Sequence, residues 1–494
     1  MGKGLLGATA VAALFSPGAR AFDDDVAIVR VQSRHFDLYT DLDRRSAVAA
    51  AEELEAGYAV LWQVFFRAQQ DPELRCLIYV IRDDRIWASI RAPQGGEDRE
   101  EVRGFFDADP ARPLFAASLS GAKSVPLRST LHELAHLFID QFLPYRPYWL
   151  NEGLAEYLAT VEVDGGTVRF GKVPEDRSSV LATPAALLPP RDLMLLSKDD
   201  EASWSARRRD YLYAECWAWV HFLIHGKDGT LAPSIDGYLR ALRAGDRELL
   251  ADHLPDGTDL DALGTDFRFY VKRGLYRFRK VEGPLDVAPV VSATRLSPSD
   301  GLAALAYVMV RSGHAGAAVA TMPREHGLPL GYLAAARIEA RAGHLDRAAR
   351  ILDAGVAAHG DDPYLLLERA RLHEDPGIAA TVSDAAARRV ADLDRIIETS
   401  PWLAAAINDR ARAALLAGDV PIALSMARRA IALRGGEALY YHTLAAALDA
   451  SGNAAGALEI ETGALPLARD ERLRKAMEEQ AARLRGALAH AASE

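Results

Sequence analysis

The stretch LHELAHLFIDQFLPYRPYWLNEGLAEY, residues 131–157, decides how the central part of this chain folds. Apolar residues recur at helical spacing through its first half, which predicts a helix that begins near Pro126 and ends before Pro144 and Pro147. Helical spacing returns over residues 149–161, after the prolines. The stretch therefore predicts two helices joined by a short loop.

The polar residues of these two helices are spaced so that they can meet. His132 and His136 lie at i and i+4 on one helix face, so both imidazole rings can converge on one ion. Glu133 lies beside them, where a carboxylate can take a proton from a bound water and later give it to a leaving amine. The second helix carries Glu152 and Glu156, again at i and i+4. A carboxylate is the expected third ligand for two imidazoles, which leaves a fourth position for water.

The motifs HELAH and WLNEGLAEY resemble those of the gluzincin metallopeptidases, that is, the thermolysin and aminopeptidase groups with their peptidase-MA-like relatives. The resemblance covers about residues 26–280. It implies that His132, His136 and Glu152 bind Zn²⁺ and that Glu133 is the general base.

Two criteria disagree about which glutamate is the third ligand. The 15 residues between His136 and Glu152, residues 137–151, make a shorter connection than is usual in the best-known gluzincins, and Glu156 fits the usual spacing better. By motif context Glu152 is the ligand, and Glu156 takes the place of a carboxylate that steadies the first histidine, a role that physical reasoning also assigns to it. Because a loop can shorten while facing side chains keep their places, Glu152 is the predicted ligand.

The sequence YAECWAWVHFL, residues 213–223, is similar to a helix of the aminopeptidase group that opens with a catalytic tyrosine. By this resemblance Tyr213 is a candidate catalytic residue, because a phenol can donate a hydrogen bond to a developing oxyanion. The alternative is an ordinary aromatic residue at the start of a buried helix. His221 and His225, on the same predicted helix, are expected to be packing or surface residues.

Two further features bear on how a peptide would be held. The segment Gly-x-Met-Glu-Asn, which anchors the free amine of a substrate in the aminopeptidase group, does not occur in the sequence, so endopeptidase action is expected. The sequence PLFAAS, residues 113–118, is predicted to be the second strand of a hairpin over residues 104–118. We expect it to be the edge strand along which a substrate lies extended.

The flanking regions predict a mixed α/β half-domain before the motif and a further helix after it. Alternating or apolar runs mark the strands, and apolar residues at helical spacing mark the helices. The predicted elements are a strand over 35–40, a helix over 45–68, a strand over 74–81 and a helix over 210–225.

Composition limits the location and the partners. Residues 1–21 combine Lys3, an apolar run and the small residues Ala19 and Ala21, which predicts a cleavable secretion signal and an exported protein, periplasmic or secreted; an uncleaved stub is the alternative. No segment is apolar for the roughly 20 residues of a membrane span. The net charge of -11 makes nucleic acid an unlikely partner.

Cysteine usage excludes a cysteine zinc site. Cys76 and Cys216 are the only two cysteines, and both lie in apolar runs without a nearby cysteine or histidine cluster. An exported location permits a disulfide between them, but buried thiols are the more frequent outcome for such residues.

The C-terminal part has a repeated pattern that begins after a proline-rich segment. Gly418 and Gly452 are 34 residues apart, and an alanine follows each by five residues, at Ala423 and Ala457. Small residues at this period resemble the tetratricopeptide repeat, a helix-turn-helix unit, over about residues 299–464. An alanine-rich helical bundle without true repeats is the alternative.

Together the patterns predict an α+β zincin-like catalytic domain, with a small mixed sheet and active-site helices, followed by an all-α tetratricopeptide-like solenoid. The expected division is a signal at 1–21, a catalytic domain at 22–280, a linker at 281–298 and a repeat domain at 299–494. Because repeats mainly contact their neighbours, a fragment ending near Pro284 is expected to fold alone.

The expected function is that of an exported zinc metallopeptidase that cleaves peptide or protein substrates and binds a protein partner through its repeats. One alternative is a catalytically idle scaffold of the cell envelope. Glu133 argues against it, because structural zinc has no use for a base beside the metal. Another alternative is a zinc hydrolase that acts on a non-peptide amide.

Overall fold

A computed structural model describes most of the chain. The predicted signal at 1–21 lies outside the described residues. Within them, no helix is long and apolar enough to cross a membrane. The described residues are 26–65, 75–90, 104–107, 109–119, 127–143, 145–164, 167–182, 187–197, 200, 204–244, 246, 249–323, 326–376, 384–468 and 470–491.

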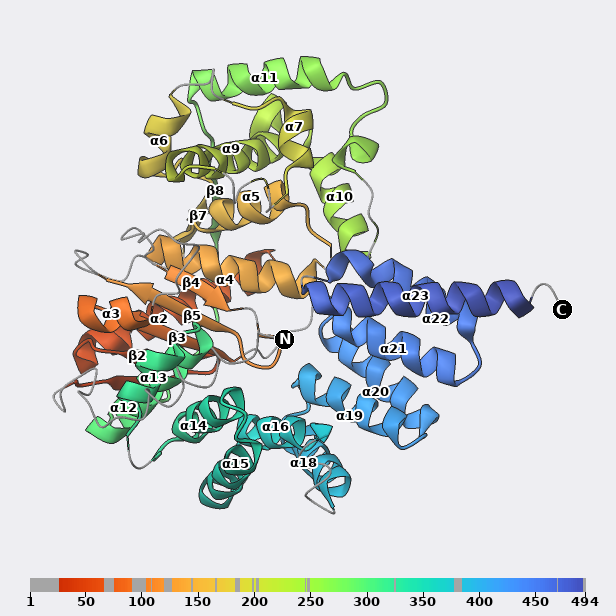
Figure 1. Ribbon diagram of the computed structural model, residues 1–494. Helices are drawn as coiled ribbons and strands as arrows, with labels where there is room; N and C mark the ends of the chain where they lie inside the picture. The colour runs from red at the N-terminus through yellow and green to blue at the C-terminus, as the bar shows by residue number, and fades with distance from the viewer. Residues whose placement is uncertain are drawn as a thin grey trace, which may run out of the picture.

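The described chain is mostly helical and contains a six-stranded mixed sheet of order β4-β5-β3-β2-β1-β9 (Figure 1). Strands β2, β3 and β5 run parallel to one another, and the other neighbours pair antiparallel. The predicted strands at 35–40 and 74–81 are confirmed within the described residues. The strands are β1 (Val29–Gln32), β2 (Phe36–Thr40), β3 (Cys76–Ile81), β4 (Gly104–Asp107), β5 (Leu114–Ser118) and β9 (Ser292–Arg295).

The hairpin predicted over residues 104–118 is confirmed, but the prediction that PLFAAS is an edge strand is wrong. Strand β5 lies between two neighbours, because Phe115 pairs with Phe106 of β4 on one side and with Ile78 of β3 on the other. The hairpin folds β4 onto the outer side of β5 and occupies its backbone. Within the described residues β4 is therefore the edge strand on this side of the sheet.

Helices cover both faces of this sheet, and alternate residues of β3 divide between two cores. Ile78 and Val80 belong to a core that includes α2 (Arg44–Val60) and α4 (Leu127–Phe142). Leu77, Tyr79 and Ile81 face a second core, formed with α3 (Asp84–Ile90) and the C-terminal helices. The helix predicted over 45–68 corresponds to α2 and a following π-helical turn that ends at residue 65, and residues 66–68 lie outside the described part.

The part of the chain that follows α4 is mostly helical and is centred on α9 (Ala206–His225). This helix begins four residues before the predicted start, because the Ser205 hydroxyl caps it by accepting from the Arg208 N–H. Helix α5 (Tyr148–Leu158) packs on α9 so closely that a Cβ atom at Gly153 would lie 2.6 Å from the carbonyl oxygen of Cys216. The other helices here are α6 (Glu175–Leu181), α7 (Pro190–Leu195), α10 (Ala232–Ala244) and α11 (Leu260–Arg273).

The two cysteines lie in separate elements, Cys76 in β3 and Cys216 in α9. Both are buried and neither is in a disulfide. Burial raises the pKa of the Cys76 thiol to about 12. Both therefore act as small apolar core residues rather than as a covalent link.

The proline-rich segment expected as a linker over 281–298 contributes strand residues to both sheets, 281–282 to one and 292–295 to the other. Strand β8 (Arg279–Glu282) pairs with β7 (Thr167–Phe170), which also pairs with β6 (Glu162–Asp164). Strand β9 then returns to the N-terminal sheet and pairs antiparallel with β1. A fragment that ends near Pro284 lacks β9, so one edge of β1 loses its partner strand while the other edge still pairs with β2.

The first C-terminal helix completes this return. Helix α12 (Pro298–Arg311) contributes Leu302, Leu305 and Tyr307 to the core on the second face of the sheet, and the Tyr79 hydroxyl donates to the Ala304 carbonyl at 3.0 Å. The C-terminal helices and the sheet therefore share one core, which differs from the expectation that a fragment without them folds alone.

The helix-turn-helix pairs predicted at Gly418 and Gly452 are confirmed, and two more pairs of the same kind occur at Gly313 and Gly343. Gly313, Gly343, Gly418 and Gly452 all have positive φ, between 76° and 89°, and each lies in a three-residue turn between two helices. A residue with a Cβ is strained in this conformation, which explains why glycine recurs there. The pairs are α12 with α13 (Ala315–Thr321), α14 (Pro329–Arg341) with α15 (Leu345–His359), α19 (Ala404–Leu416) with α20 (Val420–Leu433), and α21 (Ala438–Ala450) with α22 (Ala454–Ala464).

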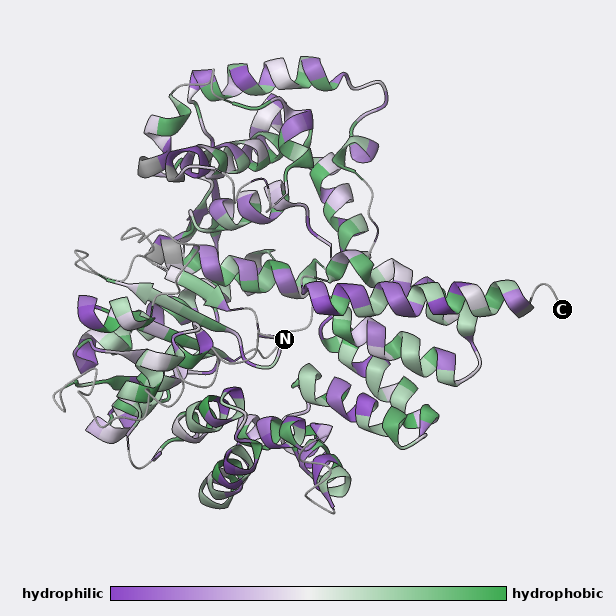
Figure 2. Ribbon diagram, in the orientation of Figure 1, coloured by the Kyte–Doolittle hydropathy of each residue, from purple (hydrophilic) through white to green (hydrophobic). Residues whose placement is uncertain are grey.

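A further pair, α16 (Pro363–Leu372) with α18 (Ala385–Thr399), lies between α15 and α19, and α23 (Glu471–Ala491) ends the described chain. We call the helices from α12 to α23, residues 298–491, the helix array. In Figure 1 the helix array forms an arc that starts against the sheet and returns to the end of α4. Figure 2 shows hydrophobic and hydrophilic residues alternating along α23, as expected of a helix with one face in contact with its neighbours.

Candidate metal centre

Helices α4 and α5 bring three potential ligand atoms into a small triangle. The Nε2 atoms of His132 and His136 are 3.0 Å apart, and Glu152 Oε2 lies 3.6 and 3.5 Å from them. A tetrahedral Zn²⁺ with ligands at about 2.0–2.1 Å places its ligand atoms about 3.3 Å apart. The three predicted ligands therefore meet in an arrangement that could hold a metal ion.

Glu156 lies behind His132 rather than in this triangle. Its Oε1 atom is 3.5 Å from Nδ1 of His132, the ring nitrogen that points away from the other two ligands. Arg128 and Arg177 donate hydrogen bonds to the same buried carboxylate. Glu156 can therefore orient the His132 ring, and the geometry favours motif context over loop length.

The two histidines differ in how their outer nitrogens are supported. Nδ1 of His132 faces Glu156, whereas Nδ1 of His136 is buried and has no hydrogen-bond partner among the described residues. The His136 ring is therefore held by the packing of neighbouring core residues, whereas the His132 ring also has a polar partner at its outer nitrogen.

The electrostatics of the cluster favour a positive charge at its centre. Burial lowers the pKa of His132, but the hydrogen bond that its ring donates to Glu152 and the charges of Glu156 and Glu133 outweigh burial and raise that pKa to about 9. Burial raises the pKa of Glu152, but the charges and hydrogen bonds of the two histidines lower it overall. The pKa of Glu156 is likewise held below its usual value, against its burial, by His132, Arg177 and Arg128.

The two remaining predicted site residues lie beside the triangle. Glu133 follows His132 on α4, is partly exposed and is not one of the three grouped ligands. The Tyr213 ring lies with its centroid 6.4 Å from that of His132, which brings the first turns of α9 to the site. The guanidinium of Arg177 lies over the Tyr213 ring, 5.8 Å from its centroid.

Arg177 and Arg128 are site residues that the sequence patterns do not single out. Arg128 precedes His132 by four residues and so shares its helix face, which is a signal that could have been used. Arg177 lies on the short helix α6 and joins Glu156 on α5 to the region of Tyr213 on α9. No spacing rule connects it to either motif.

His221 and His225 are packing residues, as predicted. The His221 ring contacts the carbonyl oxygens of Gly171 and Arg277 at 2.8 and 2.9 Å, and His225 Nε2 is 2.8 Å from the Tyr157 hydroxyl. Burial lowers the pKa of His221 to about 4, so its ring is neutral near pH 7.

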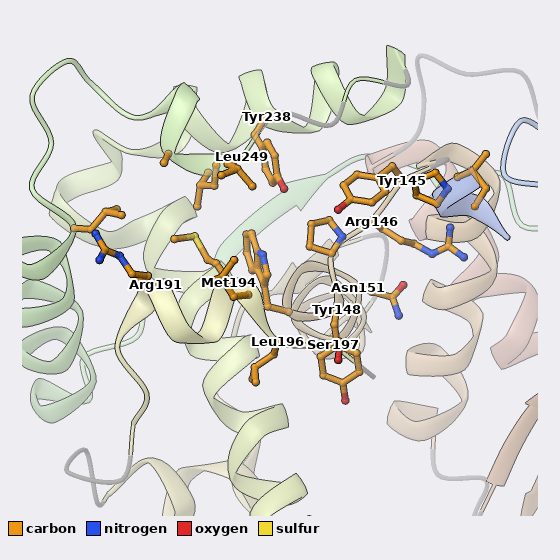
Figure 3. A pocket seen from close by; sticks show the side chains of 18 residues that line it. Tyr145, Arg146, Tyr148, Asn151, Arg191, Met194, Leu196, Ser197, Tyr238 and Leu249 are labelled. Atoms are coloured by element: carbon orange, nitrogen blue, oxygen red, sulfur yellow. The ribbon is translucent and has the colours of Figure 1, made fainter. Parts of the chain in front are cut away.

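A cavity of about 710 Å³ adjoins the site at the start of α5 (Figure 3). Asn151 lines it and also donates from Nδ2 to Glu152 Oε1 at 3.1 Å, so the cavity begins one residue from a candidate ligand. Most of its walls are aromatic or apolar, and they include Tyr145, Tyr148, Met194, Tyr238, Leu250 and Leu467.

Helix α9 also carries a buried carboxylate whose ionisation we expect to affect stability. Glu215 is 1% exposed and accepts a hydrogen bond from the Leu188 N–H, and its burial raises its pKa to about 8 against the charge of Arg208. Between its ordinary pKa and pH 8 the folded protein holds a proton that the unfolded chain has lost, so stability falls as pH rises through this window.

We therefore expect Glu215→Gln to raise stability by about 1–3 kcal/mol at pH 8 and to have a smaller effect at pH 5, because the amide stays neutral and can still accept from Leu188. Urea unfolding at the two pH values measures this. Equal pH dependence in the wild type and the variant would contradict it.

No family model and no curated protein matches this chain. Among solved structures, one described as "MamA RS-1 ArsTM double mutant" is similar over 32% of this chain and 94% of its own length, with 17% sequence identity and a TM-score of 0.25. A similarity this low carries no argument about the fold or the function of this protein.

Proposed function

We propose that this protein is an exported zinc metallopeptidase with a zincin-like catalytic region and tetratricopeptide-like repeats, and that it hydrolyses internal peptide bonds. The observation that carries the proposal is the triangle of His132, His136 and Glu152, with Glu133 beside it and outside the ligand group. A purely structural zinc site has four protein ligands, whereas three ligands leave one position open for water or substrate.

Each residue around the triangle has a separate task in the proposed reaction. Bound Zn²⁺ supplies Lewis acidity. Glu133 accepts a proton from the attacking water and delivers it to the leaving amine. The Tyr213 hydroxyl donates to the oxygen on which negative charge develops. Glu156, held by Arg128 and Arg177, keeps His132 Nδ1 engaged, which leaves Nε2 free to hold the metal when it is bound.

A peptide substrate has a strand to pair with on the sheet. Strand β4 is an edge, and α4 lies against it. We propose that the substrate adds to β4 as an extended strand, in which backbone hydrogen bonds give affinity without strict sequence preference. This replaces PLFAAS, in β5, as the strand that contacts the substrate.

The proposal for Tyr213 gives a kinetic prediction. Tyr213→Phe should retain zinc and lower kcat by about 10²-fold or more, which is the scale for losing one oxyanion donor. Tyr211→Phe is the matched control, because it removes the same hydroxyl two positions earlier on α9. If both variants turn over like the wild type, Tyr213 is only a packing residue.

Metal removal and restoration test the proposed function against hydrolysis of a non-peptide amide. The protein is stripped with a chelator, reloaded with one equivalent of zinc and offered internally quenched peptides and simple aryl amides in parallel. We expect cleavage of the peptides only after reloading, with the new ends inside the chain. Zinc-dependent cleavage of the aryl amides alone would contradict the peptidase assignment.

A further inference from the structure

The turn between β4 and β5 does not face solvent but enters the helix array. We call residues 109–113, with the sequence DPARP, the hairpin tip. Three side chains of the tip each meet a complementary group on the array, and one arginine of the array contacts both the tip and α4. We propose that the array is an intramolecular clamp: it binds the tip as an internal ligand and thereby sets the position of β4 relative to the metal-binding helix α4. The expected effect of the clamp on catalysis rests on the proposed function, whereas its expected effect on structure does not.

The acidic residue of the tip lies among arginines from three helices of the array. Asp109 is 3.7 Å from Arg311 of α12, whose side chain is 4% exposed. Arg371 of α16 and Arg337 of α14 add positive charge, and together the three hold the pKa of Asp109 below its usual value despite burial. The array therefore presents a cationic site to this carboxylate.

The small residue of the tip fills an apolar site in the array. Ala111 is 7% exposed and shares a core with residues of three array helices, α16, α18 and α19. A larger side chain has no room there without displacing the tip, because such cores are close-packed. The array residues of this core include Leu366, Leu367, Leu393, Ile396 and Ala405.

The basic residue of the tip is held on both sides. The guanidinium of Arg112 lies 4.0 Å from the centroid of the Tyr364 ring of α16, and its Nη2 atom donates to Asp37 of β2 at 3.1 Å. Its carbonyl accepts from Arg311 Nη2 at 3.1 Å. The acidic, the small apolar and the basic residue of the tip therefore each contact a complementary group of the helix array.

Arg434 connects the tip to the candidate metal centre. This residue lies between α20 and α21, and its side chain is 3% exposed. Its Nη1 donates to the Pro110 carbonyl at 3.2 Å, and its Nη2 donates to Asp140 Oδ2 at 2.8 Å. Asp140 is one helical turn after His136 on α4. Asp140 also pairs with Arg146, so Arg434 is one of two arginines that hold this carboxylate. Through its hydrogen bonds to Pro110 and Asp140, Arg434 restrains both the tip and α4.

These contacts hold the hairpin tip between two fixed parts of the helix array. One end of the array is fixed to the sheet by α12, and the region around Arg434 is fixed to α4, so the tip and its strand are held between two anchored points. The array face that recognises the tip is filled by the chain's own segment. Arg434 is therefore a positioning residue, and the tip is the partner that this face of the array binds.

Ala111→Glu in the full-length protein tests the clamp, because it places a charge in the apolar site of the tip. Ala417→Glu is the matched control, since Ala417 is exposed in a turn of the same array. Hydrogen exchange followed by mass spectrometry reports on residues 104–118 and 127–143 separately. We expect exchange in both segments to rise by at least about tenfold in Ala111→Glu and to stay unchanged in the control.

A second variant covers the case in which Ala111→Glu does not fold. Arg434→Gln removes the charge and keeps a polar side chain, and we expect the same rise in exchange in both segments, with kcat/KM lowered by at least about tenfold and Arg434→Lys partly restoring both. Unchanged exchange in folded Arg434→Gln overturns the clamp. If exchange rises in Arg434→Gln at unchanged zinc content, the clamp is supported. If the wild-type protein also shows no peptidase activity, that result contradicts only the proposed function.

Discussion

Glu152→Gln is expected to lose zinc nearly completely, whereas Glu156→Gln is expected to weaken zinc affinity by about 10- to 100-fold. Glu152 Oε2 is one corner of the ligand triangle, so the substitution removes both a ligand and the negative charge that faces two imidazoles. Glu156 approaches only the outer nitrogen of His132 and leaves the triangle intact when it is changed. The larger loss of zinc in Glu152→Gln is expected because Glu152 faces the Nε2 atoms of the histidines, whereas Glu156 faces only Nδ1 of His132.

Zinc content by plasma mass spectrometry and affinity by competition with a chromophoric chelator measure both variants beside the wild type, which should hold about one zinc per chain. Glu459→Gln, at an exposed position of α22, is the control for loss of one negative charge. The reverse ranking would make Glu156 the ligand and would give loop length precedence over motif context.

Glu133→Gln is expected to keep the metal and to lower kcat by about 10²- to 10⁴-fold, the range for a general base or acid. The amide preserves the shape of the side chain but cannot accept the proton of the attacking water. Because Glu133 lies outside the three grouped ligands, zinc content should stay at the wild-type value. Loss of metal in this variant would mean that Glu133 is a ligand and that the proposed division of roles is wrong.

The positions of the site residues on their helices could be predicted from the sequence, because they depend on local spacing. His132 and His136 share a face through the i, i+4 rule, and Gly418 and Gly452 mark turns because only glycine adopts their backbone conformation without strain. Motif context predicted Glu152 as the ligand, but which carboxylate faces the two Nε2 atoms depends on how α5 packs against α4. No spacing argument contains that information.

Two features that the sequence did not predict depend on contacts between distant segments. Strand β9 pairs with β1 although Ser292 and Gln32 are 260 residues apart, and its four residues carry no strong strand pattern. The ion pair of Arg434 and Asp140 spans 294 residues. Arginine is expected on the surface, so its burial against α4 becomes apparent only when the partner carboxylate is in view.

The most direct test of the account is to incubate the zinc-loaded protein and the zinc-loaded Glu133→Gln variant with a proteome-derived peptide mixture and to identify new termini by mass spectrometry. We expect new internal termini with the wild type and almost none with the variant. The same set of termini with both proteins, or none with either at full zinc content, would contradict the assignment of a zinc peptidase with Glu133 as its base.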